Sequence, residues 1–167
     1  MNNKCIKYGL FDAAIMPQVW FNLDSWELKY EPLYRGDHQQ IAEAIPYLIE
    51  LDSTCDMQAV LDLLTLDNYQ SGLLIESSDS LSDIVSRLAY FYHVRNKQGE
   101  PFLRRFFDLK FFNNFLYNLT SQNLQFLFGK DLVFYYLDKD KAFYHKISLP
   151  AKELRFERVD LNHFIKR

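Results

Sequence analysis

The stretch GLLIESSDSLSDIVSRLAYFY, residues 72–92, contains a strand signal followed directly by a helix signal. Its first five residues, Gly72 to Glu76, form a short apolar run that is typical of a buried strand. Ser80 and Asp83 then stand at the spacing of a helix N-cap and the third helical residue. Apolar residues recur after them with a helical period, at Leu81, Ile84, Val85, Leu88 and Tyr92. A strand that leads into an amphipathic helix predicts an α/β fold.

Strand and helix signals alternate on both sides of this stretch. Further strands are expected at 8–16, 26–34, 47–51 and 101–107, and further helices at 37–45, 57–64, 109–119 and 120–129. Residues 132–137 and 142–149 flank a charged turn and predict a C-terminal β-hairpin, followed by a short tail with a final helix. The half-exposed pattern of 26–34 and the hairpin indicate antiparallel edges. We therefore expect an α/β fold in which helices flank a mixed β-sheet. Residues 1–130 would form one α/β domain, with the hairpin and tail, 131–167, packed on it.

The composition is that of a single globular domain that is rich in aromatic residues. The chain has 167 residues, of which 17% are aromatic, and a net charge of −3, so the whole chain lacks the basic signature of nucleic-acid binding. Residues 1–100 hold 7 Lys or Arg against 15 Asp or Glu, whereas residues 101–167 hold 12 against 7. No apolar run reaches membrane-spanning length, and the first residues do not form a signal peptide. We expect a cytoplasmic protein that does not insert into membranes.

No motif for catalysis, metal binding or cofactor binding is present in the sequence. The four histidines stand at no metal-ligand spacing, and the five glycines form no phosphate-binding loop. Cys5 and Cys55 are far apart, and nothing near either one in sequence would activate a thiolate. We therefore expect neither metal nor cofactor, and no enzymatic activity. The alternatives are a small hydrolase-like enzyme with a carboxylate site that the sequence does not reveal, and a nucleic-acid-binding module in the basic C-terminal part.

The segment FLRRFFD, residues 102–108, places two arginines among aromatic residues. If it is a strand, Arg104 and Arg105 point to opposite faces, and each face is otherwise apolar. A buried arginine needs a carboxylate, for which Glu76 is the first candidate and Asp12 and Asp108 are the next. We expect Arg105 to form this structural ion pair and Arg104 to face a partner.

The predicted hairpin at 131–148 is the second candidate surface. Alternation makes both faces of its first strand apolar, and a ribbon at the edge of a domain rarely buries both of its faces. Tyr136 and Tyr144 are therefore expected to contact a partner protein, together with Tyr34 and Arg35 in the segment 32–36.

Several short segments occur in an order that resembles a known family. They are Tyr8–Asp12, Pro32–Gly36, Ile45–Leu51, Gly72–Ser77, Leu103–Asp108, Leu119–Thr120 and Phe128–Gly129. Together, over about residues 8–130, they resemble the effector chaperones, or adaptors, of the bacterial type VI secretion system, long described only as a domain of unknown function. The sequence RFFD at 105–108 matches the R-F-[YF]-D segment of that family, although Leu109 stands where a proline usually follows. The resemblance implies a non-catalytic adaptor that binds a secreted toxic effector in the cytosol and helps to load it onto the VgrG spike.

Overall fold

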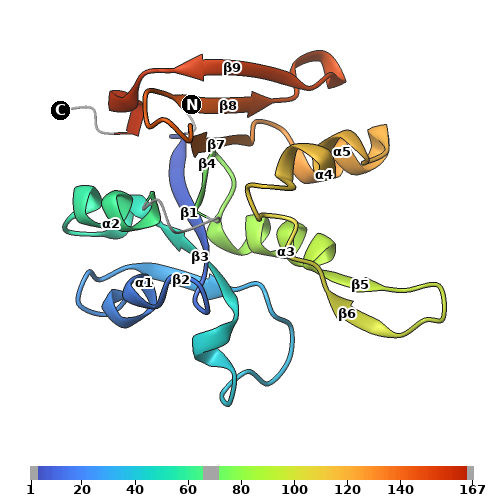
Figure 1. Cartoon of the computed structure of the whole chain (residues 1–167), viewed down its shortest axis with the longest axis horizontal. Coiled ribbons are helices and arrows are strands. Elements are labelled where there is room, and N and C mark those ends of the chain that lie inside the picture. The colour runs from blue at the N-terminus through green and yellow to red at the C-terminus, as the bar shows by residue number, and fades with distance from the viewer. Residues whose placement is uncertain (1–3, 66–71, 165–167) are drawn as a thin grey trace.

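The computed structural model describes residues 4–65 and 72–164. Its main element is a sheet of seven strands in the order β2-β3-β1-β4-β7-β8-β9 (Figure 1). These strands are β1 (Ile6–Asp12), β2 (Lys29–Pro32), β3 (Pro46–Glu50), β4 (Leu73–Ser77), β7 (Val133–Leu137), β8 (Tyr144–Ser148) and β9 (Arg155–Val159). A separate two-stranded hairpin consists of β5 (His93–Arg95) and β6 (Pro101–Leu103).

Five α-helices accompany the sheet in the described residues. They are α1 (Pro17–Asn22), α2 (Met57–Leu64), α3 (Leu81–Tyr92), α4 (Phe112–Tyr117) and α5 (Ser121–Phe128). Short 3-10 turns occur at Ala42–Ala44, Leu51–Ser53, Pro150–Lys152 and Leu161–Phe164. The predicted class, an α/β fold with a helix-flanked sheet and a C-terminal hairpin, is confirmed.

Strand pairing differs in one respect from the mixed sheet expected from sequence. Every ladder between described strands is antiparallel. The chain does cross over through α2 from β3 to β4, which therefore run in the same direction. However, β1 lies between them and pairs antiparallel with both. β3 and β4 are thus not paired with each other, and β1 is an interior strand, third from the β2 edge, although it precedes the other described strands in the chain.

Both faces of the sheet are covered, which explains why its central strands are nearly continuous apolar runs. On one face, Leu10, Ile75 and Phe134 pack with residues of α3, α4 and α5. On the other, Ile49 and Tyr135 pack with residues of α1 and α2 and with the 3-10 turn at Leu161–Phe164. Figure 1 shows α1 and α2 on one side of the sheet and α3 to α5 on the other.

Side-chain caps mark the starts of α2, α3 and α5. The Ser80 hydroxyl accepts a hydrogen bond from the Asp83 amide, 3.3 Å away, and Thr120 does the same for Asn123 at 3.1 Å. The Ser80 cap and the start of a helix at 120 are as predicted. Helix α2 is capped by Asp56, whose carboxylate accepts a hydrogen bond from the Ala59 amide.

Four expected elements differ in the structure. The strand at 101–107 ends at Leu103, and the helix at 37–45 is only the 3-10 turn at 42–44. The C-terminal tail contributes β9 and a 3-10 turn where a helix was expected. The hairpin of β7 and β8 is not an edge ribbon, because β7 pairs with β4 and β8 with β9. No helix within 4–65 or 72–164 has the length and hydropathy needed to cross a membrane.

Candidate protein-binding site

The hairpin of β5 and β6 projects from the body of the molecule at the end of α3 (Figure 1). Its turn is held by the Asn96 side chain, which accepts hydrogen bonds from the amides of Gln98 and Glu100 at 3.0 and 2.9 Å. Leu103 lies opposite His93 and Phe102 opposite Val94, so Leu103 and Phe102 belong to opposite faces. Their exposed fractions are 44% and 47%. The hairpin thus carries an uncovered apolar side chain on each face.

A groove of about 330 Å³ lies between this hairpin and the loop after β2. Tyr34 and Arg35 line one side, and residues of both hairpin strands, 93–95 and 101–103, line the other. We call it the hairpin groove. It combines aromatic and aliphatic surface with the two arginines Arg35 and Arg95, a composition typical of protein-binding surfaces.

His93 joins the two sides of the hairpin groove. Its Nε2 atom accepts a hydrogen bond from the Arg35 amide, 2.9 Å away, which requires that this nitrogen carries no proton. The His93 ring also contacts the Tyr34 ring, with centroids 5.5 Å apart. Arg35 extends from there to α3, where its guanidinium donates to the Ser86 hydroxyl at 3.2 Å. These contacts therefore fix the relative positions of the two sides of the groove, even though it lies at the surface.

The two groove arginines carry charge that the described chain does not neutralise. Neither Arg35 nor Arg95 forms an ion pair with a described carboxylate. The only described partner of the Arg95 guanidinium is the Gly99 carbonyl oxygen, 2.7 Å away. The groove is consequently electropositive in a chain whose net charge is −3.

Arg104 and Arg105 follow the hairpin directly, but not in a strand. The Arg104 amide donates to the Tyr92 carbonyl, and the chain then turns through the Phe106 amide to Arg104 carbonyl bond of 2.9 Å. Because of this turn, Phe106 and Phe107 are both buried, and the alternation assumed for 102–108 is wrong. Arg104 Nε donates to the Phe91 carbonyl, and its guanidinium lies 5.1 Å from the centre of the Phe115 ring.

The structure brings Arg105 together with only one of its three predicted carboxylates. Arg105 Nε lies 2.9 Å from Asp12 Oδ2. Asp108 accepts a hydrogen bond from the Lys110 amide in its own turn. Glu76 lies elsewhere in the sheet, where it contacts the His163 ring.

The two tyrosines predicted as partner contacts in the C-terminal hairpin pack within the protein itself. Tyr144 is only 6% exposed and packs on Phe164, so it is a core residue and offers no binding surface. Tyr136 is partly buried, with its hydroxyl bonded to Asn113 and its ring stacked on His145. The cause is the pairing of β7 with β4 and of β8 with β9, which places the ribbon inside the sheet.

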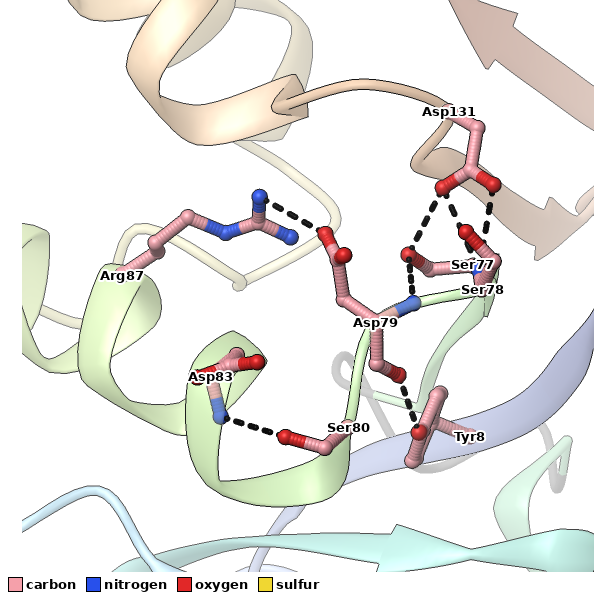
Figure 2. A network of polar contacts seen from close by, with 8 residues as sticks. All are labelled: Tyr8, Ser77, Ser78, Asp79, Ser80, Asp83, Arg87 and Asp131. Carbon is pink, nitrogen blue, oxygen red and sulfur yellow. Dashed lines mark hydrogen bonds and ion pairs between the residues drawn. The ribbon is translucent and has the colours of Figure 1, made fainter. Parts of the chain in front are cut away.

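A polar network ties the start of α3 to the chain before β7 (Figure 2). The Asp131 carboxylate accepts from the Ser77 hydroxyl at 3.0 Å and from the Ser78 amide at 3.1 Å. Next to it, Asp79 pairs with Arg87 at 3.1 Å and its carbonyl accepts from the Tyr8 hydroxyl. These bonds connect β1, β4 and the start of α3, while Nε and Nη2 of Arg87 are buried with no hydrogen-bond partner among the described residues. The network therefore holds these elements together.

The cluster with most resemblance to an enzyme site lies at the end of β4. Glu76 contacts His163, and its carboxylate interacts electrostatically with the Cys5 thiol. Burial raises the pKa of the Cys5 thiol, and the carboxylates of Glu76, Asp131 and Asp52 raise it further. A thiol held in its protonated form is a poor nucleophile. Among residues 4–65 and 72–164, no three His, Cys, Asp or Glu side chains lie together as metal ligands.

A family model, the Domain of unknown function (DUF4123), matches residues 7–125. The chain belongs to the DUF4123 family. The matched part runs from β1 to α5 and so includes both sides of the hairpin groove. No curated protein and no solved structure matches the chain significantly.

Sequence reasoning placed Tyr34 and Arg35 among the candidate residues, and both lie in the hairpin groove. It missed His93, Arg95 and the exposed pair Phe102 and Leu103 as site residues. The available signal was the turn Asn96 to Gly99 between two short strands, which predicts a hairpin as clearly as residues 138–141 do.

Proposed function

We propose that this DUF4123 protein is a non-catalytic adaptor that binds a toxic type VI secretion effector in the cytoplasm and helps to load it onto the VgrG spike. Membership of the family over residues 7–125 and the ordered segments described above support the proposal. The observation that carries it is the hairpin groove. Exposed apolar side chains on a projecting hairpin, beside arginines without carboxylate partners, suit a surface that another protein covers.

The groove suits a protein partner better than a small substrate. It is a partly open groove, with aromatic and aliphatic walls from two separate chain segments. A small-molecule site is expected to be enclosed and to converge several polar groups on its ligand. Here the carboxylates that do converge, Asp131 and Asp79, are already bonded to neighbouring serines and to Arg87.

The test combines delivery and capture in the cell that encodes the chain. Deleting the gene should abolish delivery of one effector while secretion of the tube continues, and the tagged chain should capture that effector together with VgrG. The doubly substituted chain Phe102→Ser, Leu103→Ser should fold normally but fail to restore delivery, since both side chains are exposed. Phe21→Ser is the matched control, because Phe21 is 74% exposed on α1, away from the groove. Unchanged delivery of every effector in the deletion strain would refute an adaptor role.

A further inference from the structure

We infer that the hairpin groove recognises an acidic, extended peptide segment of its partner, whose carboxylates pair with Arg35 and Arg95 while an apolar side chain packs on Tyr34 and Leu103. This inference rests on the proposed function for the partner's identity, but its chemistry follows from the groove alone.

The two arginines that line the groove indicate which charge its ligand carries. Residues 1–100 carry an excess of acidic over basic residues, 15 against 7, yet the two charged side chains that line the groove are both arginines. Neither has a described carboxylate partner, although carboxylates are abundant in this half of the chain. A guanidinium presents several donors in a planar fork that matches a carboxylate. The unused donors of Arg35 and Arg95 therefore select a ligand with negative charge.

The arginines are also held in place before any ligand arrives. Arg35 is fixed through its amide to His93 and through its guanidinium to Ser86. Arg95 is fixed to the Gly99 carbonyl within the hairpin turn. Side chains held in this way lose less conformational entropy on binding than free surface arginines do.

The walls between the arginines decide the shape of the ligand. The groove runs between a loop and a narrow two-stranded hairpin, and about 330 Å³ accommodates a few side chains but not a folded domain. Its apolar contribution comes from Tyr34, Phe102 and Leu103, of which the last two are nearly half exposed. A chain in extended form can place one side chain against these walls while its neighbours reach the arginines on either side.

A random dodecapeptide display library tests the inference without knowledge of the effector. The purified full chain is the bait, and the variant Arg35→Gln, Arg95→Gln serves for counter-selection. We expect enriched peptides with at least about two carboxylates, one for each guanidinium, around an aromatic or aliphatic residue. Their affinity should fall about tenfold or more in the double variant, and also when NaCl rises from about 0.1 M to about 1 M, which shortens the Debye length from about 10 Å to about 3 Å.

A charge-reversed bait separates recognition from a structural effect. The variant Arg35→Glu, Arg95→Glu should enrich basic peptides, whereas Arg155→Gln on β9, at the far edge of the sheet, should enrich the same acidic peptides as the unaltered chain. Enrichment of peptides without acidic bias, or no enrichment over the double variant, overturns the inference. Either result leaves the adaptor proposal open, because that depends on effector delivery. Conversely, acidic enrichment with unchanged delivery in the deletion strain would retain the groove chemistry and reject the adaptor.

Discussion

Arg105 Nε lies 2.9 Å from Asp12 Oδ2, so the segment after the hairpin is joined to the end of the central strand β1. The Asp12 side chain is 6% exposed, whereas that of Arg105 is 42% exposed. Burial raises the pKa of Asp12, although the Ala14 amide and Arg105 act to lower it. Burial also raises the pKa of the neighbouring Tyr92 to about 12, and the Asp12 charge adds to that shift. The pair thus holds a nearly buried carboxylate at the base of the hairpin.

Replacing Arg105 by alanine should destabilise the protein most at alkaline pH. The substitution leaves the Asp12 carboxylate buried without its partner, and we expect a loss of about 1–3 kcal/mol, below the value for a fully buried pair because Arg105 is partly solvated. Because the folded-state pKa of Asp12 is raised above its unfolded value, the unfolding free energy falls as pH rises from the unfolded pKa to the folded pKa. Removal of Arg105 should raise the folded pKa further and so enlarge this fall. Urea denaturation at pH 5 and pH 8 measures the difference. Introducing Asp12→Asn into the variant should remove this pH dependence, and an equal loss at both pH values would contradict the assignment.

Asp131 should have the opposite pH dependence. Burial acts to raise its pKa, but the hydrogen bonds from Ser78 and Ser77 prevail, so the pKa is lowered. Its contribution to stability is then complete above the unfolded pKa of about 3.9 and is lost as pH falls. We expect Asp131→Asn to cost about 0.5–1.5 kcal/mol at pH 7 and progressively less under acid. Glu43→Gln is the control, because Glu43 is exposed and in no described hydrogen bond. A deficit that grows on acidification would show that these bonds do not depend on the carboxylate charge.

Gly129 should tolerate no side chain. It ends α5 with φ of +56°, in a conformation that L residues rarely adopt, and an added Cβ would overlap the guanidinium of Arg87. Gly129→Ala should therefore displace Arg87 from Asp79 and lower the unfolding free energy by about 1–3 kcal/mol. In a double-mutant cycle with Arg87→Ala, the two effects should be less than additive, because the second substitution removes the clash. Strict additivity would mean that backbone strain alone accounts for the cost.

Truncation to alanine should lower stability strongly at Tyr144 and hardly at all at Phe102. Tyr144→Ala removes a core ring and should cost about 3–5 kcal/mol, as for other buried aromatic residues. Phe102→Ala, at a side chain that is 47% exposed, should change stability by no more than about 0.5 kcal/mol. Thermal unfolding of both variants decides the point. If Phe102→Ala proved as damaging as Tyr144→Ala, the hairpin would be packed against the body and the groove would not be open.

The features that sequence predicted well are those that depend on nearby residues. The caps at Ser80 and Thr120 each accept a hydrogen bond from the amide three residues later in the chain. The apolar stripe of α3 follows from the helical spacing of its own apolar residues. Strand β9 was missed because its sequence, RFERV, is mostly polar and exposed, so it lacks the alternation of a half-buried strand. The turn at 104–108 contains no glycine or proline, and its aromatic residues therefore resembled a strand.

The candidate site depends on contacts that no local pattern contains. The Arg35 amide bonds to His93 across 58 positions of sequence, and this contact joins the two sides of the groove. A ribbon with two apolar faces that its own domain does not cover was expected at residues 131–148. There, β4 and β9 supply the missing neighbours, whereas the hairpin of 93–103 has none in the described sheet.

The position of β1 has a consequence for how the chain acquires its structure. This strand leaves the ribosome before both of its neighbours, β3 and β4, in which Tyr8 pairs with Glu50 and Ile75. It must therefore wait, with apolar residues such as Leu10 and Phe11 unprotected, until about 70 further residues have been made. Contacts at such separations slow folding, since loop closure precedes any gain from pairing. The nascent chain is consequently expected to depend on general chaperones until β4 has been made.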